Sequence, residues 1–206
     1  MKFYLSSYSL GNKVQKLKKM LSKNKKTAFI SNAMDYVDDM NKRKQKDLSG
    51  MEELRKVGMK PELLDLRDYF NKREKLKRKV KEFGAFWVTG GNVFVLRHAM
   101  KLSGFDSILV GMKNRDDILY GGYSAGVCVL APTLRGMNLM DYTGFKLYSK
   151  EPVLIWEGLG ILDYSVVPHY KSDHPESKLA DKVVEYMIEN KLPFRPLRNG
   201  EVIIIE

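Results

Sequence analysis

Short apolar runs alternate with amphipathic or charged segments over the first two thirds of the chain. Apolar runs that end at glycine, serine or asparagine are typical of buried strands, and apolar residues three or four positions apart are typical of helices. The predicted strands are Lys2–Ser9, Thr27–Ile30, Lys60–Leu66, Ala85–Thr89 and Ile118–Tyr120, and the predicted helices between them are Val14–Leu21, Asp38–Lys56, Lys72–Lys81 and Phe94–Leu102.

The pattern loosens after Pro132 and returns towards the C-terminus. A strand is predicted at Ile161–Val167, an amphipathic helix at Ser177–Asn190, and a hairpin-like turn with a last strand at Leu197–Ile205. Strands that alternate with helices indicate βαβ units. The sequence therefore predicts an α/β fold with a mainly parallel sheet, formed by one domain over residues 1–206.

The chain carries a net charge of +11, which could indicate nucleic acid as a partner. The basic residues lie at helical spacing with few aromatic residues among them, a pattern that solvated helix faces explain better than a groove for bases. Nucleic acid is therefore not the expected partner. The three basic clusters are Lys13, Lys16, Lys18, Lys19, Lys23, Lys25 and Lys26; then Lys42, Arg43, Lys44 and Lys46; then Lys72, Arg73, Lys75, Lys77, Arg78, Lys79 and Lys81.

A single cysteine, Cys128, excludes an intramolecular disulfide and suits a reducing compartment. The chain has no apolar run long enough to span a membrane, and its first residues do not form a secretory signal. We therefore expect a cytoplasmic protein without membrane contact, in which Cys128 is a small core residue. A homodimer is compatible with the sequence.

The strongest chemical signal is Gly122-Tyr123-Ser124-Ala125-Gly126, which has the spacing of a nucleophile elbow between a strand and a helix. Such a turn exposes the serine hydroxyl, and side chains at the glycine positions would clash with neighbouring elements. The free N–H groups of the following helix face developing negative charge. By itself the motif also fits an ordinary strand-to-helix turn.

A serine nucleophile needs a base, and the chain has three histidines. His169 follows a strand and a proline, so it would lie at the same sheet edge as Ser124 and is the favoured base. His174 is interpreted as a loop residue or a substrate contact, and His98 as a packing or surface residue. Backbone N–H groups of Ala125 and Gly91 are the candidate oxyanion donors. No cluster has metal-ligand spacing, so we expect neither metal nor cofactor.

Four segments in this order resemble the peptidase E (α-aspartyl dipeptidase) family of serine peptidases, and in particular its short homologues from Gram-positive bacteria. They span nearly the whole chain: Trp87-Val88-Thr89-Gly90-Gly91-Asn92, Gly122-Tyr123-Ser124-Ala125-Gly126, Pro132-Thr133-Leu134-Arg135 and Val167-Pro168-His169-Tyr170. The resemblance implies a flavodoxin-like, three-layer α/β/α fold that is related to class I glutamine amidotransferases. It also implies Ser124 as nucleophile, His169 as base, and Gly91 with Ala125 as oxyanion hole.

The third relay residue is where the sequence departs from the family. The family's acid maps either near Asp141 or onto Asn199, where this chain has an amide instead of a carboxylate. Glu201 has the same strand-face parity as Asn199 and is a further candidate. The family's basic residue for a substrate aspartate maps onto Lys178, which lacks the bidentate fork of the usual arginine.

The expected function is hydrolysis of small peptides, in particular dipeptides with N-terminal aspartate. Two alternatives remain at this point. One is a serine hydrolase for another substrate, such as an ester or a β-aspartyl peptide. The other is a catalytically inactive binding homologue.

Overall fold

A six-stranded sheet forms the centre of the computed structural model, which describes all residues, 1–206. The strand order is β3-β2-β4-β5-β1-β8, and every pair is parallel except β1 with β8. A second sheet pairs β6 with β7 in parallel. The strands are β1 Lys2–Ser6, β2 Lys26–Ile30, β3 Lys60–Leu63, β4 Ala85–Val88, β5 Leu119–Tyr123, β6 Ser165–Val167, β7 Phe194–Pro196 and β8 Val202–Ile205.

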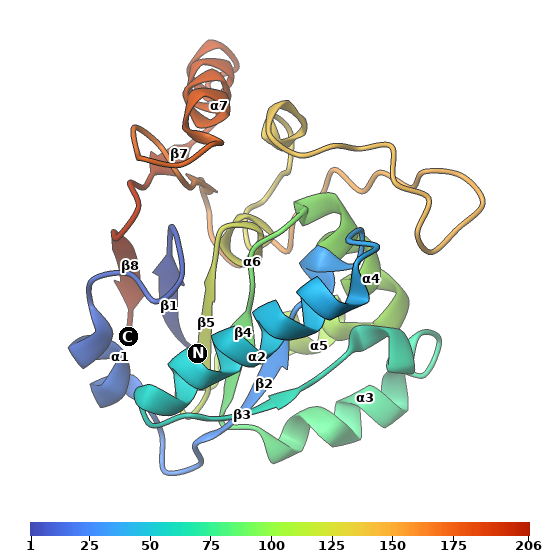
Figure 1. Cartoon of the computed structure of the whole chain (residues 1–206), viewed down its shortest axis with the longest axis vertical. Helices are drawn as coiled ribbons and strands as arrows, with labels where there is room; N and C mark the ends of the chain where they lie inside the picture. The colour runs from blue at the N-terminus through green and yellow to red at the C-terminus, as the bar shows by residue number, and fades with distance from the viewer.

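Helices cover both faces of the large sheet, so the α/β fold with a mainly parallel sheet is confirmed (Figure 1). The α-helices are α1 Val14–Met20, α2 Met40–Lys56, α3 Arg73–Lys79, α4 Val93–Ser103, α5 Phe105–Gly111, α6 Ala125–Cys128 and α7 Ser177–Glu189. None of them is long and apolar enough to cross a bilayer.

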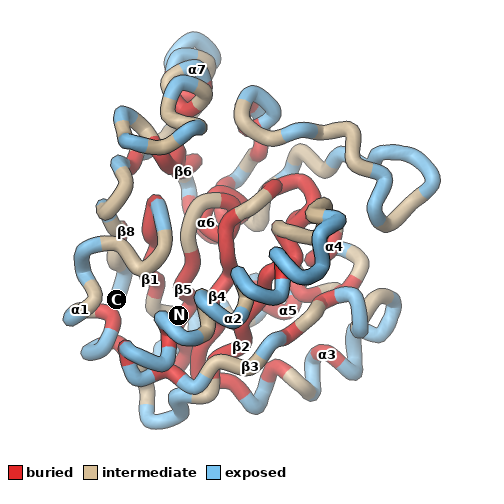
Figure 2. The backbone as a smooth tube through the Cα atoms, viewed as in Figure 1, coloured by how far each residue is buried: buried red, intermediate tan, exposed pale blue.

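The alternation of strand side chains divides the core into two clusters. Tyr4, Phe29 and Trp87 point to one face, where they pack with residues of α1 and α2 in a cluster of 10 buried residues. Neighbours such as Phe86 and Tyr120 point to the other face, in a cluster of 39 buried residues that includes α3 to α7. The buried backbone in Figure 2 therefore follows the central strands β1, β2, β4 and β5, while the outer side of α7 is exposed.

Two predicted features at the C-terminus are wrong in detail. Leu197–Ile205 does not form a hairpin, because β7 pairs with β6 and β8 pairs with β1 in the other sheet. The strand predicted at Ile161–Val167 is confined to Ser165–Val167. Both errors arise because strand pairing is set by distant parts of the chain, which local patterns do not report.

The interior differs from prediction at two further places. Helix α5, Phe105–Gly111, was not predicted; it follows Gly104, a left-handed residue that ends α4 and precedes α5. Arg43 was expected on a solvated face but is only 6% exposed and pairs with the buried carboxylate of Asp35. Cys128 is buried as expected, and burial raises the pKa of its thiol.

Candidate active site

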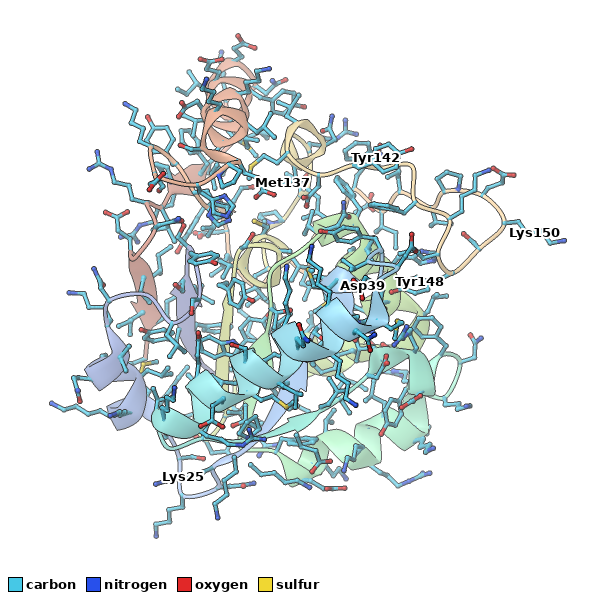
Figure 3. The ribbon with its side chains drawn as sticks, viewed as in Figure 1. Lys25, Asp39, Met137, Tyr142, Tyr148 and Lys150 are labelled. Carbon is cyan, nitrogen blue, oxygen red and sulfur yellow. The ribbon has the colours of Figure 1, made fainter.

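Candidate residues from distant parts of the sequence meet at the carboxyl ends of the strands. Strands β2, β4 and β5 are adjacent and parallel, so the segments that follow them share one edge. A cavity of about 530 Å³ opens there and is lined by Gly91, Ser124 and His169. Tyr142, from the long segment above this edge, also lines the cavity (Figure 3). Ligand sites of open α/β sheets form at this edge.

Ser124 lies on a strained turn between β5 and α6. Its φ of 50° and ψ of −119° are unfavourable for a residue with a side chain. A Cβ at Gly122 would lie 2.5 Å from the carbonyl oxygen of Val88, and one at Gly126 would lie 2.2 Å from it. Both glycines are therefore required by the close approach of β4, and this approach fixes where the serine hydroxyl points.

His169 lies beside the serine. Its Nε2 is 3.2 Å from Ser124 Oγ, and the residue is only 2% exposed. It follows β6 with a positive φ of 63°. Burial lowers the pKa of His169 to about 4, although the hydrogen bond with Asn199 opposes this shift. The imidazole is therefore neutral at physiological pH and able to accept a proton.

Asn199 contacts the other ring nitrogen of His169. Its Oδ1 is 2.8 Å from His169 Nδ1, so Nδ1 carries the proton and Nε2 presents its lone pair to Ser124. The backbone N–H of Asn199 donates to Ser172 Oγ at 2.7 Å. Ser7 Oγ, just beyond β1, donates to Asn199 Oδ1 at 3.2 Å and accepts from the backbone N–H of His169 at 2.9 Å. Ser7 thereby fixes the spacing between the two residues.

The two alternative acids lie elsewhere. Asp141 Oδ2 accepts from the N–H of Val93 at 2.7 Å, at the start of α4. Burial raises the pKa of Asp141 to about 7. The Glu201 carboxylate accepts from the N–H of Arg198 at 2.8 Å on the surface. Neither carboxylate hydrogen-bonds to His169, whereas Asn199 does.

The backbone N–H groups of the two candidate oxyanion donors are free of backbone hydrogen bonds. Gly91 has a φ of 137°, and a Cβ there would lie 2.4 Å from the carbonyl oxygen of Ala33, so only glycine fits. The backbone amides of Gly91 and Ala125 donate to no backbone carbonyl. Ala125 directly follows Ser124 at the start of α6, and Gly91 lines the same cavity.

A second histidine packs on the first. The rings of His169 and His174 stack with centroids 3.8 Å apart and planes 8° from parallel. Glu176 Oε2 lies 3.8 Å from His169 Nε2 and 3.9 Å from His174 Nδ1. Ligand atoms of these three residues lie within 4.8 Å of one another. The lone pairs of stacked imidazoles lie in parallel planes and do not converge on one ion, so we assign no metal site here.

The charges that line the cavity differ from those expected. Lys178 is exposed on α7 and is not among the lining residues. The single lysine in the lining is Lys46, on α2. Four carboxylates share the cavity with it: Asp47, Glu53, Asp141 and Glu176.

Three residues of the site were not predicted. Ser7 and Ser172 have no motif of their own, and they act through hydrogen bonds to Asn199. Glu176 lies two residues before Lys178 and also has no motif of its own. The polar end of the first strand, Ser6-Ser7, resembled the other strand ends and was the one available signal for Ser7.

Comparison with known proteins identifies a matching family and similar relatives. The model of peptidase family S51 matches residues 6–206. Lmo0363, an uncharacterized peptidase of Listeria monocytogenes, is 29% identical over 164 residues, which cover 76% of this chain and 72% of the relative. Lin0382, an uncharacterized peptidase of Listeria innocua, is 28% identical over 58% of this chain and 54% of the relative.

Two solved structures share the fold. A peptidase E candidate from Listeria monocytogenes EGD-e superimposes with a TM-score of 0.76 and 24% identity, over 99% of this chain and 93% of the other. A peptidase from an acI-B1 Actinobacterium gives a TM-score of 0.69 and 15% identity, over 100% and 83% of the two chains. With the family match along almost its full length, the chain belongs to peptidase family S51, the peptidase E family, and is a serine-type peptidase.

Proposed function

We propose that this peptidase hydrolyses short peptides with Ser124 as nucleophile, His169 as base and Asn199 as the residue that orients His169. One observation carries the proposal: Ser124 Oγ, the two ring nitrogens of His169 and Asn199 Oδ1 form a continuous row, with distances of 3.2 and 2.8 Å. This is the arrangement of a nucleophile, a base and an orienting group.

In the proposed reaction, Ser124 Oγ attacks the scissile carbonyl carbon and its proton passes to His169 Nε2. The amides of Gly91 and Ala125 would donate to the oxyanion. The C–N bond then breaks, and His169 returns the proton to the departing amine. Water, deprotonated by His169, then attacks the acyl ester; the C–O bond to Ser124 breaks, and His169 returns the proton to Ser124 Oγ.

The cavity supports small substrates. A volume of about 530 Å³ suits a dipeptide better than an extended chain. We propose that dipeptides with N-terminal aspartate are the first substrates to test. Lys46 is the lysine in the lining that could pair with the aspartate side chain, and it replaces Lys178 in this part of the proposal.

The test compares wild type with Ser124→Ala on Asp-Leu, Ala-Leu and Lys-Leu dipeptides, and on a fluorophosphonate probe that labels activated serines. We expect Ser124→Ala to lose at least about 10³-fold in hydrolysis and all labelling. Ser22→Ala, in the loop between α1 and β2 and outside the cavity lining, serves as control. Hydrolysis that survives Ser124→Ala would exclude the serine mechanism, and a flat profile across the three dipeptides would exclude the aspartate preference.

A further inference from the structure

The proposed relay has a deficit of charge. Asn199 can orient His169, but a neutral amide cannot stabilise an imidazolium as a carboxylate does. His169 is nearly inaccessible to water, so solvent stabilises the cation poorly as well. The reaction nevertheless requires His169 to hold a proton transiently while Ser124 attacks. A negative charge elsewhere near the ring would lower the cost of that state.

Glu176 carries the one carboxylate within 4 Å of His169, with Oε2 3.8 Å from Nε2. This distance is too long for a hydrogen bond, so Nε2 remains free for Ser124 at 3.2 Å. It is short enough for strong attraction once the ring is charged. We propose that Glu176 supplies to His169 the negative charge that Asn199 lacks. The inference rests on the proposed roles of Ser124 and His169.

The loop that carries Glu176 is held in place from both ends. The Glu176 N–H donates to His174 Nδ1 at 3.2 Å, and the His174 ring stacks on His169. The Ser172 N–H donates to Ser177 Oγ at 3.0 Å and closes the loop. His174 therefore acts as a spacer: it rests on one face of His169 and fixes the backbone of the residue that bears the carboxylate.

The groups around His169 leave Glu176 as the natural source of charge. The ring faces Tyr8 edge-on at 6.1 Å between centroids, and stacks on His174. Its nitrogens face Ser124 and Asn199, which are both uncharged. A protonated His174 would oppose a charge on His169, and the same proton would break the bond from the Glu176 N–H to Nδ1. Neutral His174 and ionised Glu176 are thus the pair that favours proton transfer.

The effect of Glu176 should increase when substrate binds. Its side chain is 41% exposed in the free protein, so water screens the carboxylate. Glu176 lines the same cavity as Ser124. A peptide bound over the serine would displace that water, and the attraction between carboxylate and imidazolium would become stronger in the transition state than in the free enzyme.

The test uses Glu176→Gln, which keeps the shape of the side chain and removes its charge. Glu185→Gln, on the exposed side of α7, is the matched control. We expect Glu176→Gln to slow both fluorophosphonate labelling of Ser124 and peptide hydrolysis by about tenfold or more at pH 7.5, the change that corresponds to about one pKa unit. Glu176→Asp should retain most of the activity, and Glu185→Gln should match wild type.

A rescue variant separates a charge effect from a structural one. Asn199→Asp places a carboxylate on the other side of the ring, at Nδ1. In the double variant with Glu176→Gln, we expect Asn199→Asp to restore most of the labelling rate. If Glu176 had only a structural role, a new charge at position 199 would not restore it. Wild-type labelling rates in Glu176→Gln would overturn the inference and leave the serine mechanism standing.

A second outcome would reassign Glu176. If Glu176→Gln slows peptide hydrolysis but leaves labelling by the small probe unchanged, the carboxylate binds the substrate instead of assisting His169, and the inference is overturned. Absence of labelling in wild type would contradict the proposed function itself. The three results are therefore distinguishable in one set of measurements.

Discussion

Two cavities of similar size open at opposite edges of the large sheet. The first, at the carboxyl ends of the strands, measures about 530 Å³ and contains Ser124 and His169. The second, at the amino ends of β2 and β3, measures about 640 Å³ and is lined mainly by lysines and other polar residues. Figure 3 places Lys25, from the second cavity, at the end of the molecule opposite to Tyr142, from the first.

The difference between the cavities lies in how their groups are held. The first contains a serine and a histidine at positive φ, and the histidine is buried with a lowered pKa. In the second, Lys25 and Lys60 are exposed, and neither side chain has an ion-pair partner within 4 Å. Strain and burial cost free energy and persist only where surrounding contacts enforce them. Conformation and burial therefore distinguish the candidate active site from the second cavity, and cavity size does not.

The largest expected effect comes from removing the space that the strained turn requires. Gly126→Ala would place a Cβ 2.2 Å from the Val88 carbonyl oxygen, so β4 and α6 must separate. We expect a loss of about 1–3 kcal/mol in unfolding free energy, measured by urea denaturation, together with loss of fluorophosphonate labelling. Gly111→Ala is the control, because a Cβ there meets nothing within 4 Å. Equal stability of the two variants would show that the turn is not constrained by β4.

What the sequence predicted well was local. The glycine spacing around Ser124, the Gly90-Gly91 strand end and the proline before His169 are short signals that depend on backbone sterics. Alternating strands and helices then predicted that these ends share one edge, and they do. A ligand site at this edge therefore follows from the order of strands and helices alone.

What the sequence could not predict depends on contacts between distant segments. Ser7 binds Asn199 across 192 positions of the chain, and no local pattern marks such a pair. Which of Asn199, Glu201 and Asp141 faces His169 depends on side-chain directions that the tertiary fold sets. Helix α5 is seven residues long, too short for a periodic pattern, and it directly follows the glycine that ends α4.

An intermediate effect, on the pH dependence of stability, is expected from Asp141, which lines the first cavity. Its folded-state pKa of about 7 lies above its unfolded value. The native state therefore binds more protons between about pH 4 and 7, and the stability that Asp141 contributes is lost as pH rises through about 7.

Asp141→Asn should remove this dependence while keeping a carbonyl oxygen for the Val93 N–H. We expect the unfolding free energy of Asp141→Asn relative to wild type to increase by about 1–2 kcal/mol from pH 5 to pH 8. Urea denaturation at the two pH values measures it. A difference that stays constant, or that shrinks towards pH 8, would show that burial does not raise this pKa.

The smallest effect is expected in the second cavity. Lys25→Gln combined with Lys60→Gln removes two exposed charges that have no ion-pair partner. Surface changes of this kind alter unfolding free energy by less than about 0.5 kcal/mol. The lysines lie at the opposite edge of the sheet, and exposed charges beyond about 10 Å are screened. We therefore expect labelling and dipeptide hydrolysis within about twofold of wild type. A tenfold loss of hydrolysis with unchanged labelling would instead mean that the lysine-lined cavity takes part in substrate binding. Both edges of the sheet would then contribute to peptide hydrolysis.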